Sequence, residues 1–424
     1  PDELVGRERG NNYMKMLGNK RQPLYNRAVR AKYPPGSTFK LATMLTLLDD
    51  ADMSPQTAYD THNGDPVTVG PAKNIRDSHR GDHVIDFRRA VASSSNVYFA
   101  KAIWERYGIT GKKQEYSDFL HEKLRLGQTV GLERLGERAP SITTDWKVPD
   151  PGVMLVKMSY GYRVRLAPIQ MITFYNAIAN GGRFVRPRLV SALISNGVDS
   201  VLPVSYIRDR ICSETNAARL RTMLKNVVWG NHGTGKLLRN DLVKIAGKTG
   251  TCYMIEEATK QYNQSKKRLT FCGFFPADNP RYSCIVLTCN PKQNAFGAAS
   301  TSGQALKNIA LKLYSRGLLG NESDYRQIAN PGTRPTFFAT GETDSQNNLR
   351  KELSITQSSV IRSNRTAAKG IPDVTGYGFR EAIAILERAG YNVRFTGNGY
   401  VSSQSPAAGT KSRTGTVVTL SLHP

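Results

Sequence analysis

Three short motifs, spaced widely along a chain of 424 residues, constrain this protein more than any other feature of its sequence. The first is Ser37-Thr38-Phe39-Lys40, which follows Tyr33-Pro34-Pro35-Gly36 and precedes an apolar run. Because two prolines and a glycine do not continue a helix, they predict the start of a mostly buried helix with Ser37 in its first turn. Lys40 is three residues further on, so it shares a helix face with Ser37. A desolvated lysine there can accept the proton of a serine hydroxyl and make it nucleophilic.

The other two motifs follow in a fixed order. Ser94-Ser95-Asn96 lies within Asp86 to Tyr107, a run that predicts a helix, and Lys248-Thr249-Gly250-Thr251 follows Leu242 to Ala246, which predicts a strand. Each motif alone occurs by chance in chains of this size. The order Ser-x-x-Lys, Ser-x-Asn, Lys-Thr-Gly, however, is the set found in penicillin-binding proteins and class A β-lactamases.

Over most of residues 1–318 the sequence resembles class B penicillin-binding proteins, which are peptidoglycan D,D-transpeptidases. The resemblance includes Met158 to Tyr162 and Leu166 to Gln170, and it rests mainly on the motif residues Ser37, Lys40, Ser94, Asn96, Lys248, Thr249, Gly250 and Thr251. It implies an α+β fold of the serine β-lactamase/transpeptidase type, with helices packed on an antiparallel sheet. Strand-like runs at 269–275 and 282–289 agree with that fold class.

The resemblance also implies a reaction through a serine ester. Ser37 would attack the carbonyl between the two terminal D-alanines of a peptidoglycan stem peptide, with Lys40 as the base. Ser94 would relay the proton to the leaving amine, and Asn96 would bind the substrate backbone. β-Lactam antibiotics would then be covalent inhibitors of the same serine.

Residues of the third motif would bind the substrate. Lys248 would supply positive potential, and Thr249 and Thr251, two apart on a strand, would present their hydroxyls on one face to the terminal carboxylate. By the same resemblance, Gly250 belongs to this binding strand, and the backbone N–H groups of Ser37 and Thr251 form the oxyanion hole.

Other functions remain open on the motifs alone. A D,D-carboxypeptidase would pass the ester to water, and a non-catalytic β-lactam sensor or wall-binding protein would not turn over. A class A β-lactamase is disfavoured, since its Glu-x-x-Leu-Asn segment is absent and this chain has an additional C-terminal region.

The C-terminal region predicts a second domain. A polar linker is expected at 321–369, after a transpeptidase domain at 1–320. Residues 370–424 resemble a PASTA domain, with a β-α-β-β-β order that begins with a strand at 370–374. Because such a unit is more usual in division-type enzymes, the resemblance favours septal cell-wall synthesis over cell elongation.

The net charge of +25 is compatible with a nucleic-acid partner, but the basic residues are dispersed and no nucleic-acid-binding module is recognisable. A membrane surface or an anionic wall polymer explains the charge as well, so we expect no nucleic-acid partner.

Class B enzymes normally carry an N-terminal membrane anchor, and the sequence holds no apolar run long enough to span a membrane. The resemblance therefore implies an anchor missing from this sequence and a location at the plasma (inner) membrane, with the catalytic domain on its outer, periplasmic face. It further implies a glycosyltransferase and membrane proteins of the divisome as partners.

Cofactor motifs are weak. Gly230 to Lys236 fits Gly-x-x-x-x-Gly-Lys, but Leu237 stands where a phosphate loop needs Ser or Thr, so ATP binding is not expected. The five cysteines form no Cys-x-x-Cys pair, and we expect them to be small buried side chains. The six histidines do not have the spacing of metal ligands. We predict neither a metal nor a cofactor.

Overall fold

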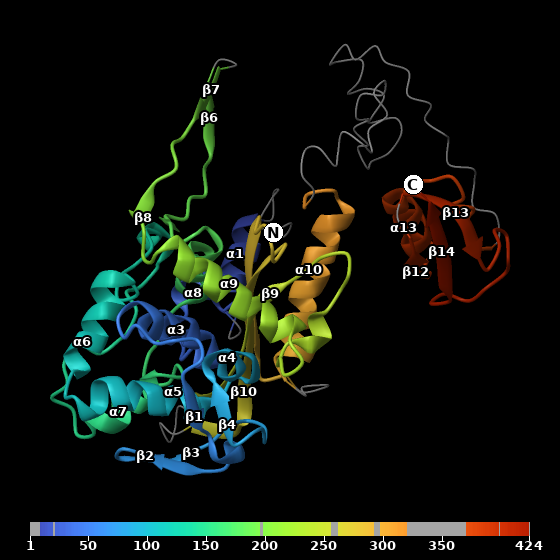
Figure 1. The fold of residues 1–424 in the computed structure, drawn as a ribbon. Coiled ribbons are helices and arrows are strands. Elements are labelled where there is room, and N and C mark those ends of the chain that lie inside the picture. The colour runs from blue at the N-terminus through green and yellow to red at the C-terminus, as the bar shows by residue number, and fades with distance from the viewer. Residues whose placement is uncertain are drawn as a thin grey trace. The chain divides into compact units, whose positions relative to one another are not determined.

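The computed structural model describes residues 9–19, 22–195, 198–255, 262–291, 297–319, 370–397 and 399–423. The chain divides into two compact units, Pro1–Leu313 and Tyr314–Pro424, and each is described here on its own (Figure 1). The segment expected to be a linker, 321–369, lies outside the described residues.

The first unit is built mainly from helices, with one larger sheet and several small hairpins. Its α-helices up to residue 315 are α1 (Arg9–Leu17), α2 (Arg27–Arg30), α3 (Lys40–Asp49), α4 (Phe87–Ser93), α5 (Asn96–Ile103), α6 (Lys113–Asp118), α7 (Pro151–Met158), α8 (Pro168–Ala179), α9 (Glu214–Trp229) and α10 (Gln304–Ser315). Two-stranded antiparallel pairs are formed by β1 (Ala58–Asp60) with β4 (Val84–Asp86), β2 (Val67–Val69) with β3 (Ala72–Ile75), β5 (Phe184–Val185) with β8 (Tyr206–Arg208), and β6 (Ala192–Ser195) with β7 (Val198–Val201).

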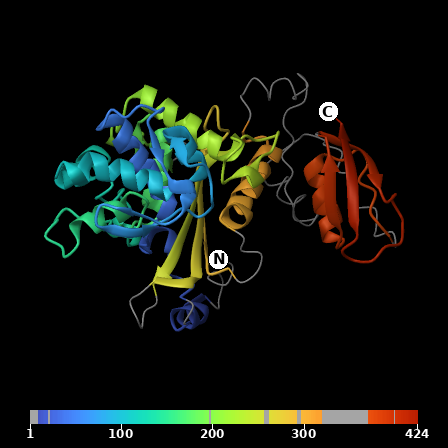
Figure 2. The same cartoon turned by 60° about the horizontal axis from the view of Figure 1, so that its bottom comes forward.

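The larger sheet has the order β11-β10-β9 and is antiparallel throughout. Its strands are β9 (Ala246–Ile255), β10 (Tyr262–Phe275) and β11 (Tyr282–Cys289), seen side by side in Figure 2. Helices α8 and α9 lie on one side of this sheet and α10 on the other (Figure 1). Helices packed on an antiparallel sheet confirm the predicted α+β class.

Helix α3 is the centre of the first unit. Every residue from Lys40 to Leu48 is buried, which confirms the buried helix expected after the first motif. The helix proper begins at Lys40, and Ser37 lies in the short 3-10 turn Gly36–Phe39 just before it. Proline and glycine at the entry favour this tighter turn over a regular helical start.

Two sequence predictions were wrong in detail. The run from Asp86 to Tyr107 is not one helix: Ser94 adopts the left-handed conformation (φ 61°), which ends α4, and the Ser95 side chain caps α5 by accepting a bond from Tyr98 N. The second motif therefore occupies the break between two helices. The strand predicted at 242–246 begins only at its last residue, so the third motif itself lies within β9.

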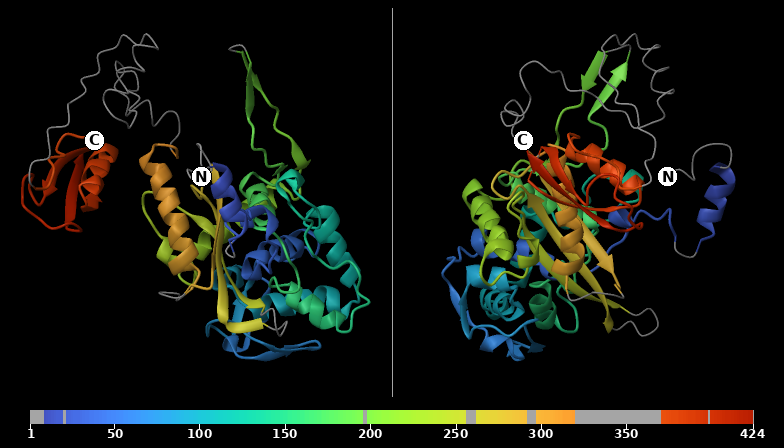
Figure 3. Two further views of the ribbon diagram at one scale, coloured as in Figure 1. Left: turned by 180° about the vertical axis from the view of Figure 1, so that it is seen from behind. Right: turned by 90° about the vertical axis from the view of Figure 1, so that its right-hand side faces the viewer.

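The second unit packs one helix, α13 (Phe379–Arg388), on a three-stranded sheet (Figure 3). The strands are β12 (Asn392–Thr396), β13 (Tyr400–Ser405) and β14 (Val417–His423), in the order β12-β14-β13. Alternate residues of β14 are buried, and they join a small core that includes Leu386, Val418 and Leu420. The helix and these three strands match the prediction, but residues 370–374 form no strand.

Two further features bear on the sequence predictions. Cys212, Cys252 and Cys272 are buried as expected, whereas Cys289 is exposed. Within the part of the chain that the structure describes, no helix is both long and apolar enough to cross a membrane.

Candidate active site

The Lys40 side chain joins the first motif to the second. Its Nζ atom lies 2.6 Å from Ser94 O, 3.3 Å from Ser94 Oγ and 2.8 Å from Asn96 Oδ1. An ammonium group has three donors, so these three acceptors satisfy it when it is charged. The left-handed conformation of Ser94 is what turns its carbonyl and hydroxyl towards one nitrogen atom. The structure thus brings Lys40, Ser94 and Asn96 together. They meet at the start of α3, which directly follows the turn that contains Ser37.

Asp77 holds the second motif in place, and sequence analysis missed it. Its Oδ1 atom accepts from the backbone N of Asn96 at 2.5 Å and from that of Val97 at 3.0 Å. The two donors are unpaired groups of the first turn of α5, where a carboxylate is favourable. Asn96 Nδ2 also donates to Arg76 O at 2.9 Å, so the Asn96 side chain is fixed at both ends. An aspartate in a polar segment some twenty residues earlier carries no sequence signal for this role.

The site contains two buried lysines, Lys40 and Lys248, whose charges repel each other. Burial lowers the pKa of Lys40 to about 7, an effect that the negative charge of Asp77 opposes. Burial also lowers the pKa of Lys248 well below its usual value, and the positive charge of Lys40 lowers it further. Both side chains are fully buried. Because the charges of the two buried amines repel, a neutral amine on at least one of them is favoured at neutral pH.

This pKa leads to a first prediction. If neutral Lys40 is the base, the second-order rate of acylation by penicillin should rise by about tenfold from about pH 6 to about pH 8 and then level off, following deprotonation around a pKa of about 7. A stopped-flow pH profile with a fluorescent penicillin measures this directly. A rate that stays constant from about pH 6 to about pH 9 would show that no group with this pKa acts in the step.

The third motif runs alongside the Ser37 turn. Gly36 adopts φ +57°, and a Cβ atom on it would lie 2.6 Å from Thr251 O. A Cβ atom on Gly250 would lie 2.9 Å from Thr38 Cγ2. Both glycines are therefore required for the close approach of β9 to the turn. The turn that holds Ser37 and the strand segment that holds Thr251 thus lie against each other.

Gly161 closes the same turn from the other side. Gly36 N donates to Gly161 O at 3.1 Å, and a Cβ atom on Gly161 would lie only 2.0 Å from Gly36 O. Since Gly161 also has φ +85°, Gly161→Ala should reduce the free energy of unfolding by about 2–5 kcal/mol, the sum of left-handed strain and overpacking. Urea unfolding followed by tryptophan fluorescence measures this, because Trp104, Trp146 and Trp229 all lie in the first unit.

Gly111 provides the matched control. It also has positive φ (+73°), but nothing lies within 4 Å of the position that an added Cβ atom would occupy. Gly111→Ala should therefore cost only the backbone strain of about 1–2 kcal/mol. Equal losses in the two variants would mean that the contact between Gly161 and Gly36 does not constrain the turn.

Thr234 is a second residue that sequence analysis missed, because it lies in the segment Gly230–Lys236, which resembles a phosphate loop without its final Ser or Thr. The segment forms the turn after α9, where Thr234 N donates to Ala92 O at 3.1 Å. The Thr234 hydroxyl lies 2.7 Å from the Thr249 hydroxyl. The hydrogen bond with Thr234 therefore orients the Thr249 hydroxyl.

Ser37 differs from its neighbours in being partly exposed. Its hydroxyl makes no hydrogen bond within the described ranges, whereas Thr38 and Lys40, which follow it in the chain, are buried and bonded. A nucleophile must be reachable by substrate, and bonds to its base often form only in the complex. The geometry thus leaves Ser37 free to react, with Lys40 one helical turn away.

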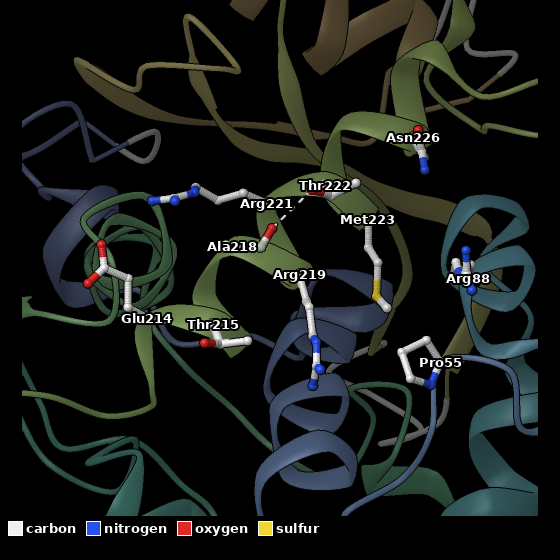
Figure 4. Close-up of a pocket in the computed structure, with 10 residues that line it drawn as sticks. All are labelled: Pro55, Arg88, Glu214, Thr215, Ala218, Arg219, Arg221, Thr222, Met223 and Asn226. Carbon is white, nitrogen blue, oxygen red and sulfur yellow. Dashed lines mark hydrogen bonds between the residues drawn. The ribbon is translucent and has the colours of Figure 1, made fainter.

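A surface concavity of about 770 Å³ is a different site (Figure 4). It lies along α9 and is lined by Arg88, Arg219, Arg221 and Met223, among others. None of the eight motif residues lines it. The described residues also contain no group of three or more His, Cys, Asp or Glu side chains placed to hold a metal ion. The concavity along α9 is therefore separate from the candidate catalytic residues around Lys40.

Comparison with known families agrees with this geometry. The model of the penicillin binding protein transpeptidase domain matches residues 4–312, and that of the PASTA domain matches residues 370–423. The apo crystal structure of penicillin binding protein 3 from Mycobacterium tuberculosis is similar with a TM-score of 0.60 at 27% identity, covering 71% of this chain and 67% of that one.

Two curated relatives match different shares of the chain. The probable peptidoglycan D,D-transpeptidase FtsI of Caulobacter vibrioides is 28% identical over 299 residues, which are 67% of this chain and 47% of that protein. Stage V sporulation protein D of Bacillus subtilis is 24% identical over 407 residues, which are 94% of this chain and 55% of that protein. The chain thus spans about half the length of these relatives. With a family model matched over most of its length and the three motifs assembled around Lys40, the chain belongs to the penicillin-binding protein transpeptidase family and carries a PASTA domain after it.

Proposed function

We propose that this protein is a peptidoglycan D,D-transpeptidase that cross-links stem peptides through an acyl-serine intermediate in septal cell-wall synthesis. One observation carries the proposal: a fully buried Lys40 amine, with its pKa lowered to about 7, bonded to both Ser94 and Asn96 beside the partly exposed Ser37. Relatives named as peptidoglycan D,D-transpeptidases support it.

Acylation would begin at Ser37. Neutral Lys40 takes the hydroxyl proton as the Ser37 oxygen attacks the carbonyl carbon of the terminal D-alanyl bond. The backbone N–H groups of Ser37 and Thr251 stabilise the negative charge on the carbonyl oxygen, where fixed dipoles contribute most. When the C–N bond breaks, Ser94 passes a proton from Lys40 to the leaving amine, consistent with the 3.3 Å between Lys40 Nζ and Ser94 Oγ.

Lys248 and the threonines would bind the terminal carboxylate. An incoming carboxylate favours the charged form of Lys248 and so opposes the lowering of its pKa by burial. A charged Lys248 in turn favours the neutral form of Lys40, so substrate binding would prepare the base. Thr249, oriented by Thr234 at 2.7 Å, and Thr251 would donate to the carboxylate oxygens.

The proposal extends to the location and the partners of the protein. It assigns the catalytic domain to the outer, periplasmic face of the plasma membrane. Its partners would be a glycosyltransferase that makes the glycan strands and membrane proteins of the divisome. β-Lactams would be covalent inhibitors, and the Mycobacterium tuberculosis protein solved with aztreonam and with ampicillin supports that assignment.

Product analysis tests the proposal against its alternatives. The protein is incubated with a D-Ala-D-Ala stem peptide as donor and a second peptide with a free amine as acceptor, and the products are separated by mass. A transpeptidase gives the cross-linked dimer and free D-alanine. Hydrolysed donor alone would indicate a D,D-carboxypeptidase, and a stable adduct without turnover would indicate a β-lactam sensor.

A further inference from the structure

The concavity along α9 has the size and the shape of wall that a ligand site requires. Its volume of about 770 Å³ lies within the range of ligand sites, which is about 300–1,000 Å³. Several of its lining residues are spaced three or four apart in α9 and therefore share one face of that helix: Thr215, Arg219, Met223 and Asn226. Helix α4, which packs on α9, contributes Arg88 to the lining.

Positive charge surrounds an apolar centre in this concavity. In Figure 4, the buried Met223 and the ring of Pro55 lie between Arg219 of α9 and Arg88 of α4. Arg221, one turn of α9 from the middle of the concavity, adds a third guanidinium group to the lining. A ligand bound here would therefore meet cationic side chains on both sides of an apolar surface.

The three arginines are not neutralised by acidic partners. Among the described residues, no carboxylate forms an ion pair with Arg88, Arg219 or Arg221. Glu214, an acidic residue that also lines the concavity, pairs with Arg210 at 3.8 Å instead. Since guanidinium groups bind carboxylates and phosphates through two parallel hydrogen bonds, this uncommitted charge favours an anionic ligand.

Two of the guanidinium groups are already held in position. Arg219 Nη1 donates to Asn216 Oδ1 at 3.1 Å, and the buried Asn216 donates from Nδ2 to Asp49 Oδ1 at 3.1 Å. Arg221 Nη1 donates to Ala179 O at 3.3 Å. Each bond engages one N–H donor of its guanidinium group, so further donors remain for a ligand. Side chains that are positioned beforehand lose less conformational entropy when the ligand binds.

The apolar centre distinguishes between two kinds of anionic ligand. A phosphate polymer carries negative charge along its length and has little apolar surface to bury against Met223 and Pro55. A peptide segment with both carboxylates and apolar side chains matches both features, because burial of its apolar groups adds to the pairing of its charges. Asn226 also lines the concavity, and its amide can bond to a peptide backbone.

We propose that the concavity along α9 binds a short acidic segment of a partner protein, in which apolar residues separate the carboxylates. Charge complementarity with this basic chain favours such a partner and speeds its encounter. Because none of the motif residues lines the concavity, the proposal does not depend on the reaction at Ser37.

Three peptides of equal length test the proposal. Glutamate alternates with leucine in the first, glutamate with serine in the second and lysine with leucine in the third, and each carries a neutral fluorophore. Fluorescence anisotropy at an ionic strength of about 0.15 M gives the Kd of each peptide for the full chain. We expect the Glu-Leu peptide to bind at least about tenfold more tightly than either of the others, because it alone matches both the charge and the apolar centre.

Substitutions in the concavity should weaken this binding. Arg88→Gln and Arg219→Gln should each raise the Kd of the Glu-Leu peptide by about tenfold, the effect of one lost hydrogen-bonded charge contact. Arg134→Gln is the matched control, because Arg134 is also an exposed arginine but does not line the concavity. It should change the Kd by less than about twofold, which excludes a general effect of the net charge. The rate of acylation by penicillin, measured on each variant, checks that the fold is intact.

Each contrary outcome has a distinct meaning. No binding of the Glu-Leu peptide, or an unchanged Kd in both Arg88→Gln and Arg219→Gln, would overturn the site. Equal affinity for the Glu-Leu and Glu-Ser peptides would show that the apolar centre is not used, and equal weakening in Arg134→Gln would attribute binding to net charge. If inorganic tripolyphosphate bound more tightly than the Glu-Leu peptide and depended on the same two arginines, the ligand would be a phosphate polymer and the proposed peptide would be wrong.

Discussion

Lys40→Arg is expected to reduce acylation by β-lactams by about a thousandfold, within the range for loss of a positioned base. Arginine keeps the positive charge but stays protonated in proteins, so it cannot take the Ser37 proton. The pKa of Lys40, lowered to about 7 by burial, is the property that the substitution removes. The measurement is the second-order rate of labelling by a fluorescent penicillin, with tryptophan fluorescence as the check of folding.

Lys248→Arg is the comparison for that variant. Lys248 is also fully buried, so both substitutions place a larger cation in a closed site. Its proposed role needs only positive charge, and the expected loss is therefore smaller, about 10- to 100-fold, or about 1.4 to 2.7 kcal/mol of activation free energy. If the two variants acylate at the same rate, Lys40 is not the base, and proton transfer through Ser94 or a water molecule must replace it.

Ser37→Ala is expected to abolish labelling completely, because the substitution removes the oxygen atom that is proposed to form the ester. The substitution should change the free energy of unfolding by about 1 kcal/mol or less, since Ser37 is partly exposed and its hydroxyl has no partner in the part of the chain described. Folding can thus be separated from chemistry by urea unfolding. Residual labelling in a folded variant would show that a second residue is acylated.

Sequence alone predicted those parts of the fold that depend on local patterns. The buried helix after the first motif and the strands β10 and β11 have continuous apolar residues between clear breaks. The three motifs identified the family, because their order is more specific than any one of them.

The rest depended on contacts between distant residues. The break at Ser94 could not be predicted, because its left-handed conformation is stabilised by a long-range bond from Lys40 to its carbonyl. The hydrogen bonds of Asp77 and Thr234 join segments that have no motif of their own. In the second unit, residues 370–374 have a strand-like composition but no ladder partner, and composition alone does not reveal whether a partner exists.

The site of the covalent adduct tests the central claim most directly. The protein is incubated with benzylpenicillin, its intact mass is measured, and a digest is mapped by tandem mass spectrometry. Opening of the β-lactam ring releases no atoms, so we predict a gain of one whole antibiotic molecule, located on Ser37 in the peptide that precedes α3. An adduct located on any other residue, or no adduct on a protein that still cross-links stem peptides, would contradict the assignment of Ser37 as the nucleophile.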